Sequence, residues 1–135
     1  MAVVVGYVPT SEGRAALRQA TQECLLRNAR LVVINSHRGG NALDAKDAAR
    51  TAKDLEDVRS TLGAQGLEHE VRQLVRGLEP SEDLIAVAEE VAADLIVIGL
   101  RRRSPVGKLI LGSNAQRILL DAPCPVLAVK AQDEA

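Results

Sequence analysis

Residues 99–108 gather positive charge without a compensating acid. Arg101, Arg102 and Arg103 are consecutive, a lysine closes the segment, and no aspartate or glutamate occurs in it. Such a charge excess is stabilised either by solvent or by a bound anion, and guanidinium groups can donate two parallel hydrogen bonds to phosphate oxygens. The segment therefore indicates either a solvated basic loop or one wall of an anion site.

Gly112, Ser113 and Asn114 follow this segment and are expected to open a helix. The first N–H groups of a helix are unpaired and carry a partial positive charge, which favours a phosphate at that position. Ser113 has a second expected role, because Ser113-Asn114-Ala115-Gln116 matches the capping box S-x-x-Q. The two roles can coexist where backbone N–H groups reach the ligand. We predict that Ser113 caps the helix and that a phosphate contacts this turn.

Several other site patterns are absent from the sequence. A Walker A loop needs a glycine five residues before its Gly-Lys pair, and Arg102 stands at that position before Gly107. No G-x-G-x-x-G follows the first apolar run, no G-x-S-x-G occurs, and His37 and His69 lack the spacing of metal ligands. Because no positioned nucleophile or base emerges, the sequence predicts a binding protein and not an enzyme.

Five stretches have the pattern of strands. Four are apolar throughout and rich in β-branched residues, which is typical of parallel strands covered on both faces. They comprise residues 3–8, 31–34, 95–98 and 126–129. The fifth, residues 67–74, alternates apolar and charged side chains, as in a half-covered edge strand.

Helical spacing of apolar residues separates these runs. We expect helices over residues 11–28, 45–63 and 113–120, with a further helix whose first turn holds Pro80. The alternation of strands and helices predicts one α/β domain over residues 1–135, with a parallel sheet and helices on both of its faces. Ligands of such sheets bind beyond the carboxyl ends of the strands, so Val8-Pro9-Thr10-Ser11 and the loop from Ser36 are further candidates.

The composition excludes some partners. The 135 residues carry a net charge of −1, and there is no Trp, no Phe and a single Tyr. We therefore expect no binding to nucleic acid, which needs a basic surface or stacking aromatics. The start lacks the basic region of a signal peptide and no 18 consecutive residues are apolar, so we expect no membrane association and a cytoplasmic location. Cys24 and Cys124 are expected to be reduced.

Three segments together resemble the universal stress protein family. They are the run Asp94-Leu95-Ile96-Val97-Ile98-Gly99, the pair Gly112-Ser113, and the ending Ala122-Pro123-Cys124-Pro125-Val126-Leu127-Ala128-Val129. The resemblance covers essentially the whole chain. It implies a five-stranded parallel sheet of strand order 3-2-1-4-5, and a homodimer that pairs through the edge strand Val126–Lys130.

The resemblance also implies a bound adenine nucleotide, ATP or a relative of it. Members that bind ATP share the pattern G-x2-G-x9-G-[S/T], which Gly99, Gly112 and Ser113 match. Two positions depart from the family. Arg102 replaces the second glycine, and Val8 stands where binding members usually carry an aspartate that meets the nucleoside.

On this basis the adenosine is expected over Val8, Pro9 and Thr10, with Ser36 lining the base pocket. The phosphates are expected at Gly99, Gly112, Ser113 and Asn114, with Arg101 and Arg102 supplying positive charge, and Mg²⁺ can accompany the nucleotide. The function predicted is a small dimeric stress-response module that binds an adenine nucleotide. The alternative is a dimeric interaction module without a nucleotide, which Val8 and Arg102 favour.

Overall fold

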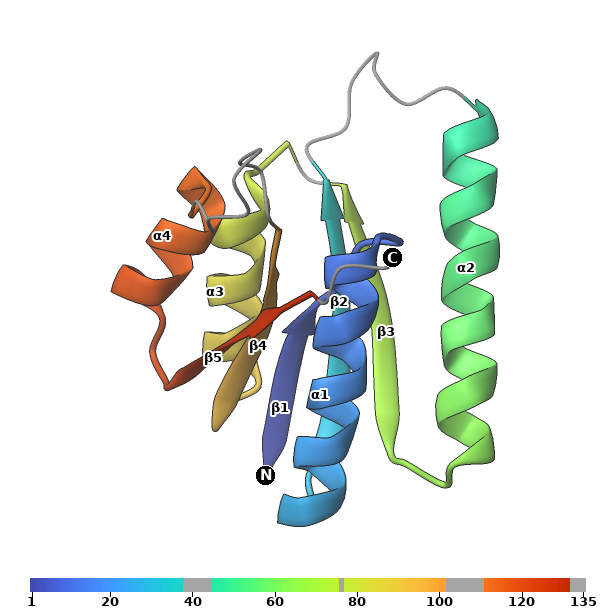
Figure 1. Ribbon diagram of the computed structural model, residues 1–135, viewed down its shortest axis with the longest axis horizontal. Coiled ribbons are helices and arrows are strands. Elements are labelled where there is room, and N and C mark those ends of the chain that lie inside the picture. The colour runs from blue at the N-terminus through green and yellow to red at the C-terminus, as the bar shows by residue number, and fades with distance from the viewer. Residues whose placement is uncertain (38–44, 76, 102–110, 132–135) are drawn as a thin grey trace.

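The structure is a computed structural model that describes residues 1–37, 45–75, 77–101 and 111–131. Strands and helices alternate along the chain, and Figure 1 shows the strands side by side with helices in front of and behind them. In chain order the elements are β1 (Ala2–Gly6), α1 (Ser11–Arg27), β2 (Arg30–His37), α2 (Ala45–Ala64), β3 (His69–Val75), α3 (Pro80–Glu90), β4 (Leu95–Leu100), α4 (Ser113–Asp121) and β5 (Val126–Lys130). The helix bounds agree with the sequence expectation to within one residue where both ends were predicted.

All neighbouring strands are parallel, and their order is β3-β2-β1-β4-β5. This confirms the predicted fold class and strand order. β2 and β3 lie in succession on one side of β1, whereas β4 and β5 lie in succession on its other side. The carboxyl ends of β1 and β4 therefore diverge into helices on opposite faces, and this switch point is where parallel sheets hold ligands.

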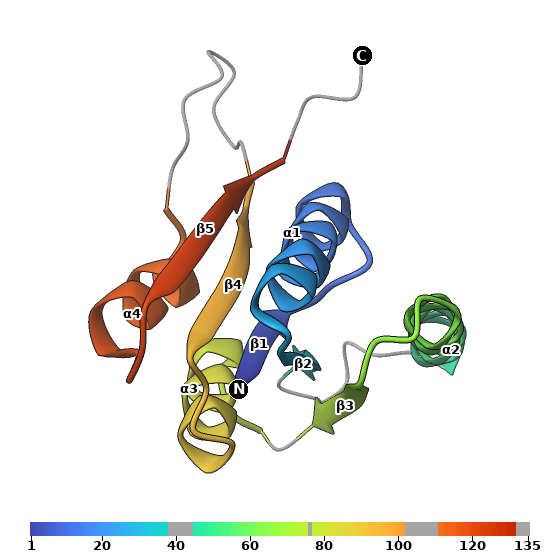
Figure 2. The same ribbon diagram turned by 90° about the horizontal axis from the view of Figure 1, so that it is seen from below.

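Two hydrophobic cores cover the sheet, one on each face. The first contains Ala16, Ala20 and Leu55, from α1 and α2, and the second contains Leu84 and Ile118, from α3 and α4. Figure 2 shows the same pairing of helices, with α1 and α2 on one side of the sheet and α3 and α4 on the other. Because the central strands contact both cores, their side chains are apolar on both faces, which explains the continuous apolar runs in the sequence.

β3 is an edge strand, as its alternating pattern predicted. Val71 packs against the first core, whereas Arg72 pairs with Glu70 and with Glu90 at the end of α3, both at 2.7 Å. On α2, Arg59 donates a hydrogen bond of 3.5 Å to the Val71 carbonyl. Charged groups thus accompany this edge of the sheet. Among the described helices, none is long and apolar enough to cross a bilayer.

Candidate functional site

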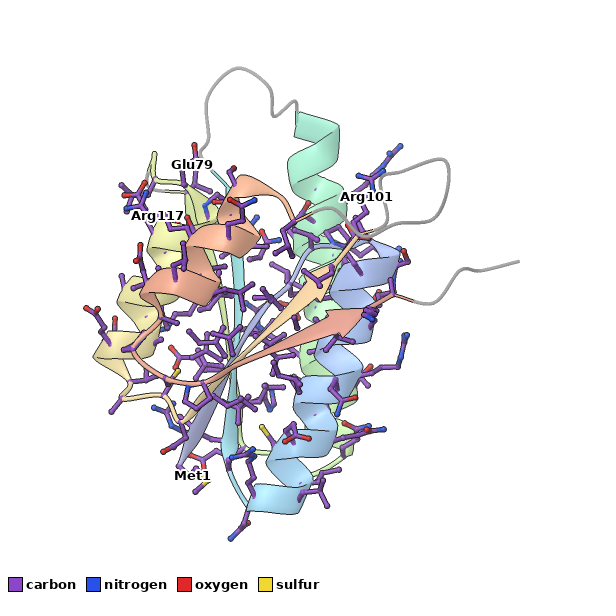
Figure 3. All side chains as sticks on the ribbon, turned by 60° about the vertical axis from the view of Figure 1, so that its left-hand side comes forward. Met1, Glu79, Arg101 and Arg117 are labelled. Atoms are coloured by element: carbon purple, nitrogen blue, oxygen red, sulfur yellow. The ribbon has the colours of Figure 1, made fainter. Side chains whose placement is uncertain are left out.

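A cavity of about 320 Å³ opens at the carboxyl ends of β1, β2 and β4. Its walls come from loops and helix starts that are distant in sequence but lie close together at the carboxyl ends of the strands. Figure 3 shows Arg101, after β4, and Glu79, before α3, toward one end of the molecule, with Met1 at the other. The residues that line it are Gly6, Tyr7, Val8, Glu12, Gly13, Ile34, Ser36, Pro80, Leu84, Ile98, Gly99, Leu100, Arg101, Gly112, Ser113, Asn114, Ala115 and Ile118. The position is the one that the strand order requires.

The N-terminal turns of three helices, α1, α3 and α4, line this cavity, but they differ in whether their first N–H groups already have hydrogen-bond partners. In α1, the Thr10 side chain caps the helix by accepting a hydrogen bond from the Gly13 N–H at 3.2 Å. In α3, Pro80 has no N–H, and the Ser81 N–H donates to Asn114 Oδ1 at 3.2 Å. No side chain of the described residues caps α4, which follows Gly112. The first N–H groups of α4, for which no side-chain cap is present among the described residues, are therefore left for an external acceptor.

The N-terminal turn of α4 departs from the prediction. Gly112 is the capping residue and Ser113 is the first residue of the helix, so the predicted capping box with Ser113 as the cap is wrong. The Gln116 side chain donates to the Leu111 carbonyl at 3.2 Å and does not reach back to the cap as a capping box requires. The motif match failed because the helix begins one residue earlier than the pattern assumes. As a consequence, the Ser113 hydroxyl is not used for capping.

Asn114 has a structural contact that the sequence did not indicate. Its side-chain carbonyl accepts the hydrogen bond from Ser81, so it links the first turn of α4 to the first turn of α3. Ser81 is only 1% exposed. Asn114 lines the cavity, and its side-chain oxygen already accepts a hydrogen bond from the neighbouring helix, which fixes this wall.

Gly99 lacks a side chain for a reason of packing. A Cβ at this position would lie 2.2 Å from the carbonyl oxygen of Glu12, in the first turn of α1. Gly13 is similarly enclosed, because a Cβ there would lie 1.8 Å from the Val8 carbonyl oxygen. At Gly112, in contrast, no atom of the described residues, apart from its chain neighbours, lies within 4 Å of where a Cβ would be. The first motif glycine thus permits α1 to approach β4, whereas the last has no such packing role among the described residues.

The part of the cavity lined by β2 and α3 is apolar with one polar pair. Ile34, Pro80 and Leu84 line it together with Ser36. The Ser36 hydroxyl donates a hydrogen bond to the carboxylate of Asp83, a residue of α3 that is fully buried. A buried carboxylate needs such partners because its desolvation is costly.

Tyr7 connects the cavity to the face of the sheet covered by α2. The residue lines the cavity, but its side chain belongs to the first core and its hydroxyl donates to Asp54 of α2. Burial, and then the hydrogen bond to Asp54, raise the pKa of this phenol far above its usual range. The Tyr7 carbonyl accepts a hydrogen bond from the buried Asn35 amide at 3.0 Å, which fixes the backbone beside the site.

Most of the predicted site residues meet at this cavity. They are Val8, Ser36, Gly99, Arg101, Gly112, Ser113 and Asn114. Pro9 and Thr10 are not among its lining residues, and Thr10 serves instead as the cap of α1. Arg102 lies outside the described residues.

Sequence reasoning missed the acid Glu12, which lines the cavity next to Gly99. An acidic residue in the first turn of a helix is explained by the helix dipole, so nothing in the sequence distinguished it as a site residue. Among the described residues, no group of three or more His, Cys, Asp or Glu side chains could by itself hold a metal ion.

Comparison with known proteins adds a family and several solved structures. Residues 1–130 match the family model described as the universal stress protein family. A universal stress protein of Mycolicibacterium smegmatis is 44% identical over 128 residues, which are 95% of this chain and 96% of that protein. A solved universal stress protein of Archaeoglobus fulgidus is 38% identical, has a TM-score of 0.82, and is matched over 96% of this chain and 98% of its own.

Two further solved structures contain nucleotides. One is a universal stress protein from Archaeoglobus fulgidus in complex with dAMP, with 34% identity, a TM-score of 0.76, and coverage of 96% of this chain and 98% of that one. The other is a universal stress protein in complex with cAMP, with 27% identity, a TM-score of 0.70, and coverage of 98% of both chains. With the match over residues 1–130 and the relative that is 44% identical, the chain belongs to the universal stress protein family.

Proposed function

We propose that this protein binds an adenine nucleotide in the cavity at the ends of β1, β2 and β4, and acts as a non-enzymatic dimeric response module. The observation that carries the proposal is the cavity's polarity. The uncapped N-terminus of α4 and Arg101, after β4, line one part of the cavity, and apolar side chains of β2 and α3 with the Ser36–Asp83 pair line another. A nucleotide has the same polarity, with an anionic phosphate at one end and a flat base at the other.

The dimensions of the sheet support this orientation. β2 and β4 flank β1, so their ends are two strand spacings apart, about 10 Å. That separation suits a nucleoside whose base lies near Ser36 and whose first phosphate lies near Gly112 and Ser113. The cavity volume of about 320 Å³ falls at the lower limit of ligand pockets, about 300–1,000 Å³. The solved relatives with dAMP and cAMP support the same ligand class.

Thermal unfolding of nucleotide-free protein with Mg-ATP, ADP, AMP or cyclic AMP tests the proposal. A ligand at one hundred times its Kd adds about 2.7 kcal/mol to the free energy of unfolding, which raises the Tm by about 10 °C in a chain of this length. GTP and UTP at the same concentration are the controls. If none of the adenine nucleotides raises the Tm, the alternative function, a dimeric interaction module without a nucleotide, is favoured. Val8 in place of the family's aspartate would then explain the absence of binding.

Dimerisation is proposed through β5, the other edge of the sheet. Its side chains contact both cores, with Leu127 and Val129 in the first and Val126 and Ala128 against the second. Leu120 of the preceding helix is 82% exposed. Because an edge strand leaves one row of backbone N–H and C=O groups unpaired within the sheet, a second copy can complete it.

The hydrogen bonding of β5 defines a sharp test. The Ala131 N–H donates to Leu100 and the Ile96 N–H donates to Pro125, so by alternation along the strand the Ala128 N–H points away from β4. Ala128→Pro removes an outward donor and is expected to dissociate the dimer in sedimentation experiments while the circular dichroism remains native. Val129→Pro, the matched control, removes a bond to β4 and should lower the Tm. A wild-type protein that sediments as a monomer would refute this part of the proposal.

A further inference from the structure

The hydrogen bond between Ser36 and Asp83 leaves the Ser36 hydroxyl able to accept a hydrogen bond from a ligand in the cavity, but not to donate one. A serine hydroxyl has a single proton and two lone pairs. Here the proton is donated to Asp83, which is fully buried, and Ser36 itself is only 7% exposed. What remains on the Ser36 oxygen is its capacity to accept. A ligand group that meets this oxygen must therefore be a donor.

The fold places this acceptor away from the phosphate end. Ile34 and Ser36 are two residues apart on β2, so their side chains lie on the same face, and both line the cavity. Gly99, near the end of β4, and Arg101, which follows it, are on the other side of β1. In the orientation supported above, Ser36 is next to the base.

We propose that Ser36, held as an acceptor by Asp83, recognises the exocyclic amino group of the base and selects 6-amino purines over 6-oxo purines. This inference rests on the proposed nucleotide binding and names the group that determines its specificity. The two residues come from elements distant in sequence, and neither belongs to the glycine pattern or the basic segment.

Inosine nucleotides probe this contact because a 6-oxo group takes the place of the 6-amino group, while N1 changes from an acceptor to a donor. Purine riboside nucleotides, which lack the amino group but keep N1 as an acceptor, separate the two changes. The 6-oxo group of inosine would place an acceptor against the Ser36 oxygen, with no proton between the two atoms. Rotating the hydroxyl to donate to the ligand would remove its hydrogen bond to the buried Asp83 carboxylate. Either outcome costs about one hydrogen bond to a charged or buried group, so we expect ITP to bind about 10- to 100-fold more weakly than ATP.

Calorimetric titration with Mg-ATP, Mg-ITP and the Mg-triphosphate of purine riboside, which has hydrogen at position 6, measures this selectivity. In wild-type protein both analogues should bind more weakly than ATP. Ser36→Ala should weaken ATP about tenfold and reduce the ATP/ITP ratio to near one. Asp83→Asn should also reduce the ratio, because an amide can donate to Ser36 and so free the hydroxyl to donate to a 6-oxo group.

Two controls separate selectivity from general damage. Ser113→Ala, at the phosphate end, should leave the ATP/ITP ratio unchanged whatever it does to both affinities, and Ser60→Ala, exposed on α2, should change neither affinity. If Asp83→Asn does not give native circular dichroism, Ser36→Ala alone decides. Equal wild-type affinities for ATP and ITP overturn the inference but leave nucleotide binding intact, as does an equal loss of both in Ser36→Ala. Absence of binding by any nucleotide overturns both proposals.

Discussion

Gly99 and Gly112 match the same sequence pattern, yet the structure predicts opposite consequences for replacing them with alanine. At Gly99 the new methyl group would lie 2.2 Å from the Glu12 carbonyl oxygen and 2.7 Å from its carbon. Because ordinary contact begins at about 3.4 Å, the first turn of α1 must move away from β4 by about 1 Å. Backbone atoms cannot rotate aside as a side chain can, so we expect the upper part of the range for overpacking, about 3 kcal/mol.

Such a loss should lower the Tm of Gly99→Ala by about 10 °C. Gly112→Ala is the matched control, because beyond its chain neighbours its methyl group would meet no atom of the described residues within 4 Å, and its φ of −72° suits alanine. Its Tm should remain within about 2 °C of the wild type, while the methyl group in front of α4 should weaken ATP by about tenfold or more. Differential scanning calorimetry and nucleotide titration on both variants provide the comparison. A Gly99→Ala protein as stable as wild type would refute the assignment of this glycine to packing.

Three further predictions concern ionisable groups. Tyr7 is the sole tyrosine and there is no tryptophan, so absorbance at 295 nm reports on the ionisation of Tyr7 alone. Because burial and the hydrogen bond to Asp54 raise the pKa of Tyr7, no phenolate should form near pH 10 in the folded protein. The free energy of unfolding should therefore keep its full value below pH 10 and fall above it, where only the unfolded chain ionises. An absorbance rise at pH 10 with native circular dichroism would contradict this. Burial raises the pKa of Cys24 to about 11, so a thiol reagent at pH 8 should modify Cys24 only after unfolding. Glu12→Gln should tighten the binding of Mg-free ATP about fivefold, by removing roughly 1 kcal/mol of repulsion from the phosphates, and weaker binding would instead indicate that this carboxylate helps to hold a cation.

The order of elements could be predicted because each is a local pattern with a physical cause. Continuous apolar runs indicated strands between two helical layers, and the alternation around Val71 identified an edge strand, since only one face of β3 reaches the first core. The strand order itself needed the family resemblance, because local patterns do not state which strands are neighbours.

The site was predicted less completely, because its decisive contacts join residues distant in sequence. Ser36 and Asp83 are separated by 47 positions, and Asn114 and Ser81 by 33. No spacing rule detects such pairs. The predicted helix begins at Ser113, as α4 does, but the capping box placed the cap at Ser113 and the structure places it at Gly112, because such a motif is matched on residue types alone. The role of Gly99 was likewise hidden, since a glycine that permits helix packing and one that admits a phosphate look identical in a sequence.

The two edges of the sheet, β3 and β5, differ in a way that limits how many copies of the chain can join edge to edge. At β3, Arg59 already occupies the Val71 carbonyl and charged side chains flank the strand, whereas β5 presents an apolar strand with no such cover among the described residues. A sheet with two open edges could recruit copies at both and grow into a filament. If two copies pair through β5 as proposed, while the β3 edge is obstructed, neither copy keeps an open edge for a third, so assembly by this route would end at a symmetric dimer with one cavity in each copy.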